Sequence, residues 1–356
     1  MKINTYLKAI ILKFISNKKY LEFDVKLSTK VLMLRYDRIG DMILTTPVFR
    51  ELKAAYPNIE INVLASKANF LILKNNPNVD NVYLNNKNNL FFDLPLLFKL
   101  RKQKIDTCIE FDHSVIRHAI LRLKIINPKK IISVKKNGRY GLKGNELKLY
   151  DFYTEKKENA HFRDIWLETL RPFQVIPKHN SYEIFCDEKD QDQAFKFLKK
   201  FSNKLLVGIN LKGAVKGKKI RFSELKEICK GLYKLHNNIQ IIILFSPAEE
   251  EEIKYKISNL NLAYVAKSYK TNTINSVSAL IENLDIIITP DTSITHIAST
   301  FNKPVISIHE KNEESHKLFA PTSDLNRTIF SNSNNSLEGF SVAAVINATD
   351  DLIKLM

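Results

Sequence analysis

Glycine and cysteine are both scarce in this sequence of 356 residues. Only 9 glycines occur, and none belongs to a Gly-x-Gly-x-x-Gly, P-loop or Gly-x-Ser-x-Gly segment. The sequence therefore lacks the fingerprints of dinucleotide binding, Walker-type nucleotide hydrolysis and hydrolase nucleophiles. The 3 cysteines are far apart and show no CxxC spacing. This usage argues against a zinc or redox site and favours buried thiols in a reducing cytoplasm.

Metal-ligand patterns and long apolar runs are also missing. The 8 histidines show no metal-ligand spacing. Residues 190–192 spell a known Asp-x-Asp metal-binding pattern, but they lie in a charged run and are expected to form a solvated helix start. We therefore expect no metal ion. No apolar run approaches the roughly 20 residues that a membrane-spanning helix needs.

Acidic residues are outnumbered: 38 Asp and Glu stand against 55 Lys and Arg, which gives a net charge of +17. Such a surplus favours anionic partners, namely nucleic acid, anionic lipid headgroups or phosphorylated substrates. AT-rich coding, which also enriches Asn and Ile, is an alternative source of part of the excess. Hydrophobic residues make up 44% of the chain, and its length is typical of two globular domains.

Residues 1–29 form a separate basic and apolar segment. Five apolar residues fall on one face of a helix there: Leu7, Ile10, Ile11, Phe14 and Ile15. Lys13 cuts the apolar stretch short and no small-residue cleavage site follows, so a secretory signal is not expected. We expect a basic amphipathic helix on the inner leaflet of a membrane. The alternative is a helix that packs on its own domain.

Short β-branched runs alternate with helical patterns through both halves of the chain, which predicts parallel sheets covered on both faces. The predicted strands are Val31–Arg35, Ile61–Ala65, Asn81–Leu84, Thr107–Phe111, Ile131–Val134, Leu205–Asn210, Gln240–Phe245, Asp285–Thr289 and Val305–His309. The predicted helices include Met42–Tyr56, Phe91–Lys104, Ser223–Leu235, Ala248–Ser258, Asn275–Asn283 and Ile294–Thr300. We therefore predict an α/β protein with two Rossmann-like, doubly wound domains.

The polar stretch Val175–Tyr182 is the best candidate for a linker between these domains. The predicted domains are then residues 30–178 and residues 179–335, followed by a C-terminal helical segment, 336–356. In open parallel sheets, ligands bind outside the carboxyl ends of the strands. The loops after Arg35, Asn210, Phe245, Thr289 and His309 are where we look for chemistry.

The loop after the first predicted strand places Asp41 in the first turn of a helix, just after Gly40. An acidic residue there is favoured by the helix dipole, which is a purely structural explanation. The same position puts a carboxylate at the carboxyl edge of the sheet, where it can take a proton from a hydroxyl.

Three further loops are candidates for an anionic nucleotide ligand. The segment 209–221 contains two glycines and five basic residues, a composition that suits a diphosphate but also a solvated surface loop. The segment 285–296 runs from a strand through Asp291 into a helix start at Thr292 and Ser293, a typical anion site. His296 lies one helical turn further on, where it is either a site residue or a packing residue. In 246–252, four acids at a helix start offer one carboxylate for a ribose diol.

Together these segments resemble glycosyltransferase family 9, the ADP-heptose:lipopolysaccharide heptosyltransferases. RYDRIGDMILTTPVFRELKAAYPNIEINVLAS is similar to that family's strand, "IGD" turn and "TTP" helix, and ITPDTSITHIASTFNKPVISI is similar to its "DTG-x-x-H" segment. NLKGAVKGKKI, SPAEEEE and NAHFRDIWLETL match further, weaker segments, and the resemblance spans residues 30–325. It implies a GT-B fold, with the two domains facing across a cleft, and inverting, metal-independent sugar transfer without a cofactor beyond the nucleotide sugar.

The resemblance also implies roles for single residues. Asp41 would be the general base that activates the acceptor hydroxyl. Lys218 and the amides of Gly213 and Ala214 would hold the donor phosphates. Glu249 would bind the ribose. Asp291 would contact the donor sugar or phosphate, the Thr292 and Ser293 amides would brace the diphosphate, and His296 would support that turn. The C-terminal helix would pack back on the first domain.

Three departures from the family pattern leave the identity of the donor sugar open. Ser293 replaces the usual glycine, Ile220-Arg221 stands where Trp-Pro is common, and EKNEESHK follows His309 in place of a Gly-Pro-Thr-rich loop. The expected reaction is transfer of heptose from ADP-heptose to a lipopolysaccharide core, by a cytoplasmic enzyme on the inner membrane. The alternatives are another nucleotide-activated hexose, or a non-catalytic polyanion-binding protein. Nucleic acid is not an expected partner, because no RNA-binding aromatic motif or recognition helix is visible.

Overall fold

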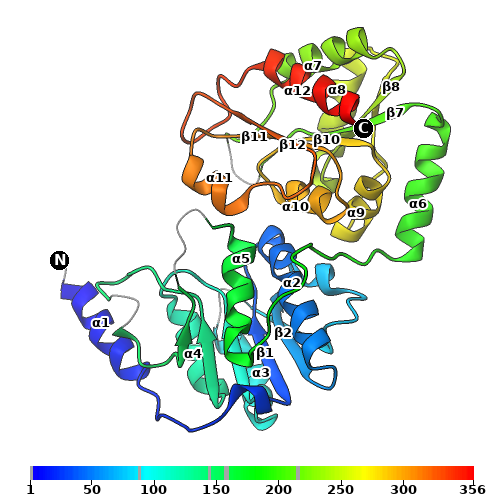
Figure 1. Ribbon diagram of the computed structural model, residues 1–356. Coiled ribbons are helices and arrows are strands. Elements are labelled where there is room, and N and C mark those ends of the chain that lie inside the picture. The colour runs from blue at the N-terminus through cyan, green and yellow to red at the C-terminus, as the bar shows by residue number, and fades with distance from the viewer. Residues whose placement is uncertain (1–2, 87–89, 143–145, 156–159, 214–216) are drawn as a thin grey trace. The chain divides into compact units, whose positions relative to one another are not determined.

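The chain divides into two compact units, Met1–Asn180 and Ser181–Met356, and the division falls inside the predicted linker. The computed structural model describes residues 3–86, 90–142, 146–155, 160–213 and 217–356, with side chains from residue 7. Each unit is described by itself below, with the element labels of Figure 1.

The first unit is built on a six-stranded sheet in which every neighbouring pair is parallel, with the order β3-β2-β1-β4-β5-β6. Its strands are β1 (Lys30–Leu34), β2 (Glu60–Ser66), β3 (Asn81–Asn85), β4 (Thr107–Glu110), β5 (Lys130–Ser133) and β6 (Phe152–Tyr153). The strand order reverses between β1 and β4, as in a Rossmann fold. β1 and β4 are buried over almost their whole length, which explains their continuous apolar sequences.

Helices cover this sheet (Figure 1), and they contact one another in two pairs. They are α2 (Ile39–Ala55), α3 (Leu90–Lys102), α4 (Arg117–Ile126) and α5 (Phe162–Leu167). α2 contacts α5, and α3 contacts α4. The contact between α2 and α5 matters for function, because it brings the loop after β1 close to aromatic residues of α5.

The N-terminal helix α1 (Ile3–Ile15) packs on α4 of its own unit. Ala9 and Leu12 are buried in a core cluster of that unit. The opposite side of the helix leaves four large apolar residues exposed: Leu7, Ile10, Ile11 and Phe14. Of the predicted apolar face, only Ile15 packs against the domain, and its other four residues face solvent.

The second unit repeats the same topology, with the sheet order β12-β11-β10-β7-β8-β9 and parallel neighbours throughout. Its strands are β7 (Leu205–Asn210), β8 (Ile239–Leu244), β9 (Val265–Lys267), β10 (Ile286–Pro290), β11 (Val305–His309) and β12 (Asn326–Phe330). The order reverses between β7 and β10. All nine strands predicted from the sequence are present in the two sheets, and the two doubly wound Rossmann-like folds are confirmed.

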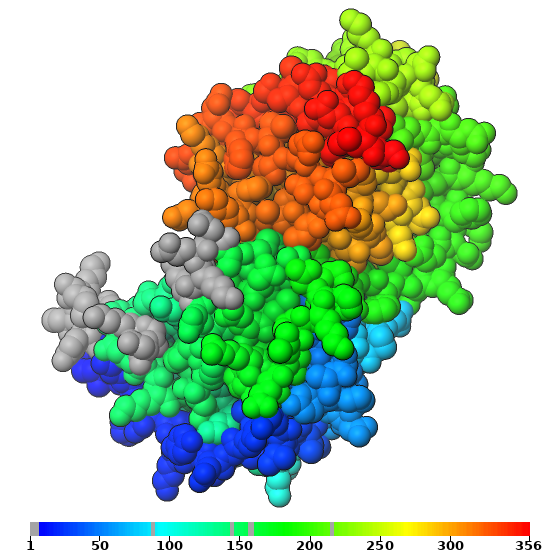
Figure 2. Space-filling model, viewed as in Figure 1, coloured from blue at the N-terminus to red at the C-terminus, as the bar shows by residue number. Residues whose placement is uncertain are grey.

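The helices of the second unit are α6 (Glu188–Leu198), α7 (Phe222–Leu235), α8 (Glu250–Leu260), α9 (Ile274–Glu282), α10 (Ser293–Thr300), α11 (Glu313–Phe319) and α12 (Val342–Leu355). The expectation that the C-terminal helix packs on the first domain is wrong. α12 lies along α7 at the surface of the second unit (Figures 1 and 2). Val345, Ala348 and Leu352 are part of the core of this unit, because the apolar side of α12 completes the cover over its sheet.

Two thiols are fully buried, as the cysteine usage predicts: Cys108 on β4 and Cys229 on α7. Burial raises the pKa of the Cys229 thiol to about 12 and that of Cys108 well above its usual value. Within the described part of the chain, no helix is both long and apolar enough to cross a bilayer.

Candidate functional site

Asp41 lies in the first turn of α2, directly after the first strand of the sheet. The helix begins at Ile39, earlier than predicted, so Gly40 is a helical residue and not the end of the preceding turn. The Arg38 amide donates to the Asp41 carboxylate at 3.3 Å, a contact that satisfies one of the free N–H groups of the helix start. The sequence thus places this carboxylate at the carboxyl edge of the sheet, as expected.

Arg35, at the end of β1, ties the Asp41 loop to the aromatic cluster behind it. Its guanidinium lies 3.5 Å from an oxygen of Asp41 and 3.7 Å from an oxygen of Asp37. It also lies 3.9 Å from the centre of the Trp166 ring, a close cation–π contact. The Arg35 side chain is only 3% exposed, so these contacts hold it in one position. Arg35 is therefore a rigid support for the Asp41 carboxylate.

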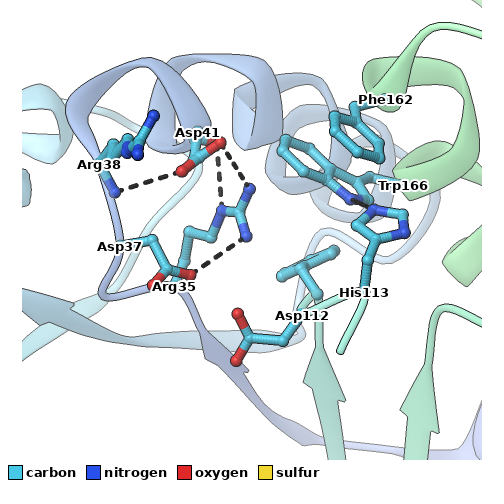
Figure 3. A pocket seen from close by; sticks show the side chains of 9 residues that line it. Arg35, Asp37, Arg38, Asp41, Asp112, His113, Phe162 and Trp166 are labelled. Carbon is cyan, nitrogen blue, oxygen red and sulfur yellow. Dashed lines mark hydrogen bonds and ion pairs between the residues drawn. The ribbon is translucent and has the colours of Figure 1, made fainter. Parts of the chain in front are cut away.

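These residues line a pocket of about 320 Å³ in the first unit (Figure 3). It opens at the reversal of strand order, because its residues follow β1 and β4 or come from α2 and α5. The lining consists of two arginines, three aspartates and four aromatic or imidazole side chains: Arg35, Arg38, Asp37, Asp41, Asp112, Phe111, His113, Phe162 and Trp166. Charged groups beside ring faces are typical of sites that bind polar ligands with exposed C–H groups, such as sugars.

The aromatic wall of the pocket is well packed. The Phe162 and Trp166 rings are stacked at 5.5 Å between centres, and the Trp166 Nε1–H donates to His113 Nε2 at 2.9 Å (Figure 3). At the base of the pocket, burial raises the pKa of the Asp112 carboxyl well above its usual value, and the nearby Glu110 and Asp37 carboxylates raise it further. Asp112 therefore holds a proton more readily than an ordinary aspartate.

Sequence reasoning found Asp41 in this pocket but missed most of its other residues. Asp112 and His113 directly follow a predicted strand, Thr107–Phe111, at the carboxyl edge of the sheet. This position was the signal that could have found them. Phe162 and Trp166 lie in the segment NAHFRDIWLETL, which the resemblance included without assigning these two residues a role.

A second group of polar residues lies at the strand reversal of the second unit, where β7 and β10 are neighbours. Asn210 ends β7, and its side chain donates to the Thr289 hydroxyl at 3.0 Å and to the Lys212 carbonyl at 3.1 Å. It thereby joins the loop after β7 to the end of β10. The loops after β7 and β10, both of which were candidates from the sequence, are thus held together.

α10 begins at this same edge. Thr292 is its N-cap residue, and the Thr292 hydroxyl accepts a hydrogen bond from the Ile294 amide at 3.1 Å. Ser293 is the first helical residue, so Thr292 and Ser293 lie at the positive end of the helix dipole, as predicted. This is the local geometry that favours a phosphate group.

Lys218 lies beside this helix start, and its ammonium contacts two carboxylates. It lies 3.2 Å from an Asp291 oxygen and forms an ion pair with Glu310. His309 Nε2 lies 3.4 Å from the same Asp291 oxygen. Burial opposes the charged form of Asp291, but the contacts with His309 and Lys218 outweigh it and hold the pKa of this carboxyl far below its usual range. Lys218 and Asp291 are thus brought together as predicted.

The structure corrects the role expected for Gly213. Its amide donates to the Lys218 carbonyl oxygen at 2.5 Å, so it stabilises the loop and is not directed at a ligand. A Cβ at this position would lie 2.5 Å from the Lys218 Cβ, which explains why only glycine fits. Ala214, the other residue expected to offer an amide, lies outside the described residues.

Glu249 lies after β8, in a short turn that precedes α8, and its carboxylate is already engaged. It accepts hydrogen bonds from the amide and hydroxyl of Ser246 at 2.9 and 2.6 Å, and Lys212 lies 2.7 Å away. Partial burial would raise the pKa of Glu249, but these contacts lower it. A ribose diol at this carboxylate would therefore compete with Lys212.

His296 is a buried packing residue beneath the Asp291 turn. Its side chain is 4% exposed, and its ring packs edge-on to Tyr182 and near Phe319. Burial lowers the pKa of His296 to about 4, so the ring is neutral at pH 7. The supporting role that the resemblance implies for His296 stays a prediction.

One group of residues has the composition of a cation site. Ligand atoms of Asp291, His309 and Glu310 lie within 4.8 Å of one another. The Lys218 ammonium contacts both of these carboxylates and supplies the positive charge that a metal ion would otherwise bring. The Asp-x-Asp pattern lies at the start of α6, as predicted; Asp192 is exposed, whereas Asp190 is half-buried and accepts a hydrogen bond from Ser276 at 2.6 Å.

The sequence profile of glycosyltransferase family 9 (heptosyltransferase) matches residues 96–343, more than half of the chain. The chain belongs to glycosyltransferase family 9. It is 25% identical over 280 residues to the lipopolysaccharide core heptosyltransferase OpsX of Haemophilus influenzae, with 78% of each chain covered. A family 9 crystal structure from Veillonella parvula superposes with a TM-score of 0.77 at 18% identity, covering 95% of this chain and 100% of that one. The Escherichia coli heptosyltransferase WaaC with ADP gives a TM-score of 0.71 at 16% identity, covering 91% and 98%.

This family 9 chain is accordingly a glycosyltransferase of the heptosyltransferase family with the GT-B fold of its structural neighbours. Its two groups of polar residues lie at equivalent places, each at the strand reversal of its own unit. The non-catalytic alternative is thereby set aside, because both groups fall within a family of transferases.

Proposed function

We propose that this family 9 chain is an inverting, metal-independent heptosyltransferase that transfers heptose from ADP-heptose to a lipopolysaccharide core. The observation that supports it most directly is the Asp41 carboxylate, fixed by Arg35 in an aromatic-walled pocket at a strand reversal. Similarity to OpsX, a lipopolysaccharide core heptosyltransferase, supports the acceptor class. The fold shared with WaaC, whose structure contains ADP, supports the nucleotide.

In the proposed mechanism, Asp41 acts as the general base. Its carboxylate takes the proton of the acceptor hydroxyl while the hydroxyl oxygen bonds to the anomeric carbon of the donor sugar. The bond between this carbon and the diphosphate breaks at the same centre, and the nucleoside diphosphate leaves with the electron pair. A single displacement of this kind inverts the anomeric configuration. Arg35 acts as a positioning residue, since it contacts Asp41 and not the reacting atoms.

The second unit is proposed to stabilise the departing diphosphate. Lys218 supplies positive charge, and the amides of Thr292 and Ser293 at the start of α10 supply hydrogen bonds. Glu249 is proposed to bind the ribose once Lys212 gives way. No metal or other cofactor is needed in this scheme, because fixed cationic and dipolar groups neutralise the charge that develops.

A second donor is favoured by one observation. The segment EKNEESHK stands where the family usually has a Gly-Pro-Thr-rich loop, and its first residue, Glu310, lies against Lys218. A change at this place suits a nucleotide-activated hexose in place of ADP-heptose, with the same mechanism.

We further propose that the protein works in the cytoplasm at the inner-membrane surface. The exposed apolar residues of α1 and the net charge of +17 both suit an anionic lipid surface. A lipid-linked acceptor would be presented there.

The proposal is tested by offering ADP-heptose and a panel of UDP- and GDP-hexoses with truncated lipopolysaccharide, with and without EDTA. We expect transfer from ADP-heptose, at an unchanged rate in EDTA. Transfer from UDP- or GDP-sugars alone would reject heptose and leave the mechanism in place, whereas loss of activity in EDTA would reject metal independence.

The role of Asp41 is tested by Asp41→Asn. Its kcat should fall by about 100-fold to 10,000-fold, the usual contribution of a general base, while the circular dichroism spectrum stays unchanged. Asp192→Asn is the matched control, because Asp192 is exposed on α6 and pairs only locally with Lys196. Asp41→Asn with wild-type kcat would remove this residue from the mechanism.

A further inference from the structure

Glu310 is a buried acid at the carboxyl end of β11, directly after His309, and it stands at the Lys218 ammonium. The residue is 7% exposed, and its carboxylate forms an ion pair with Lys218 Nζ. The same ammonium lies 3.2 Å from Asp291. Two carboxylates therefore share one ammonium, although one carboxylate would be enough to neutralise it.

This arrangement has a consequence for any diphosphate that Lys218 binds. Counting Asp291, Glu310 and Lys218, the cluster has two negative charges and one positive charge. A nucleoside diphosphate adds at least two more negative charges close to the same ammonium. Repulsion between Glu310 and the phosphates is strong here, because the Glu310 side chain is only 10% exposed and water screens it weakly.

Glu310 is the more replaceable of the two carboxylates. Asp291 is also in contact with His309, and the loop that contains it continues directly into α10. Among the described residues, the Glu310 carboxylate forms an ion pair with Lys218 alone. A diphosphate that reaches Lys218 can thus take the place of Glu310 without disturbing the start of α10.

We propose that Glu310 competes with the diphosphate for Lys218 and thereby sets how tightly the site holds a nucleoside diphosphate. This inference rests on the proposed nucleotide-sugar donor. In the empty enzyme, Glu310 keeps Lys218 in place beside Asp291. After sugar transfer it returns to Lys218 and so weakens the hold on the nucleoside diphosphate product, which favours its release.

The test is calorimetric titration of the full chain with ADP, repeated with UDP and GDP. Glu310→Gln keeps the shape of the side chain and removes the competing charge, so the Kd of the nucleotide that binds should fall by about tenfold or more. Glu314→Gln is the matched control, since Glu314 is exposed on α11 and loses the same charge. Its Kd should stay within about twofold of wild type, because exposed charges are well screened.

A double-mutant cycle separates competition for Lys218 from a general effect of charge. In a Lys218→Met background there is no ammonium to compete for, and Glu310→Gln should then change the Kd by much less. In steady-state assays, Glu310→Gln should lower the KM for the donor and strengthen inhibition by the nucleoside diphosphate product.

The outcomes are distinguishable. Binding of a nucleoside diphosphate with equal Kd to wild type and Glu310→Gln overturns the inference and leaves the proposed function standing. An equally large gain in the Lys218→Met background also overturns it, because the effect would then not pass through Lys218. Failure of all three nucleotides to bind either protein overturns both the inference and the proposed donor class.

Discussion

His296 illustrates how a single buried side chain makes the stability of the fold depend on pH. Its ring is neutral and lies beneath the Asp291 turn, and its pKa is about 4 in the folded protein. In the unfolded chain the pKa of a histidine is about 6.5. Between these two values the unfolded state binds a proton that the folded state does not, so the free energy of unfolding must fall as the pH is lowered.

We expect this effect to be removed by His296→Phe. In the wild-type protein, His296 should contribute a loss of about 3 kcal/mol in the free energy of unfolding as the pH falls from 7 to 4. Urea unfolding of both proteins across this range measures the difference, because other titrating groups contribute equally to both. Parallel pH curves for the two proteins would contradict the pKa assigned to His296.

At the scale of single residues, the sequence predicted the positions of those residues that are fixed by the neighbouring strand and helix. Asp41, Thr292 and Ser293 were found because each lies in the first turn, or at the cap, of a helix that follows a strand. The ion pair of Lys218 with Glu310 was not predicted. It joins residues 92 positions apart, and only the parallel pairing of β7, β10 and β11 brings their loops together.

At the scale of elements, α12 matters because it completes the core of the second unit. Leu352 is fully buried in this core, whereas Leu355, one turn further along the helix, is 60% exposed. Leu352→Ala should lower the free energy of unfolding by about 2–4 kcal/mol, and Leu355→Ala by less than about 0.5 kcal/mol. Urea denaturation measures both. Equal effects would show that α12 is not packed as described.

The exposed face of α1 allows a direct test of membrane binding. Ile10→Ser/Phe14→Ser removes two exposed apolar residues and leaves the buried Ala9 and Leu12 unchanged. Sedimentation with anionic vesicles should fall at least about fivefold, because apolar area drives interfacial binding. Ile176→Ser is the control, since Ile176 is 87% exposed and lies far along the chain. Unchanged sedimentation of the double variant would leave α1 without a role at the membrane.

The elements that sequence patterns missed were mostly at the edges of the sheets. β6, β9 and β12 were not predicted, and each is an edge strand. Their residues are largely half-buried or exposed, so they lack the continuous apolar run that identified the central strands.

The predicted starts of two helices differ from the observed starts because their capping signals are weak. α2 and α7 begin after an arginine whose amide is capped by an acid three residues later, a signal weaker than a Ser or Thr cap.

At the scale of the whole molecule, the same strand order occurs twice, and each unit has its own buried cluster. The number of domains and the approximate boundary could be predicted, because a repeated strand and helix pattern with a polar break is visible along the chain. The placement of α12 could not be predicted, since its apolar face can pack on any sheet face that is not already covered by helices.

The two buried thiols also let the chain report on its own unfolding. Cys108 lies in the core of the first unit and Cys229 in that of the second, and both are 0% exposed. With their pKa values raised by burial, neither offers a thiolate to an alkylating reagent while its unit is folded. Burial also raises the pKa of Cys186 to about 12, so its thiol reacts slowly, but it is only half-buried. We therefore expect iodoacetamide to modify Cys186 first, and each of the other two only after its own unit opens. Mass spectrometry of the alkylated peptides along a urea gradient would then follow the two halves of one chain separately, without any added label.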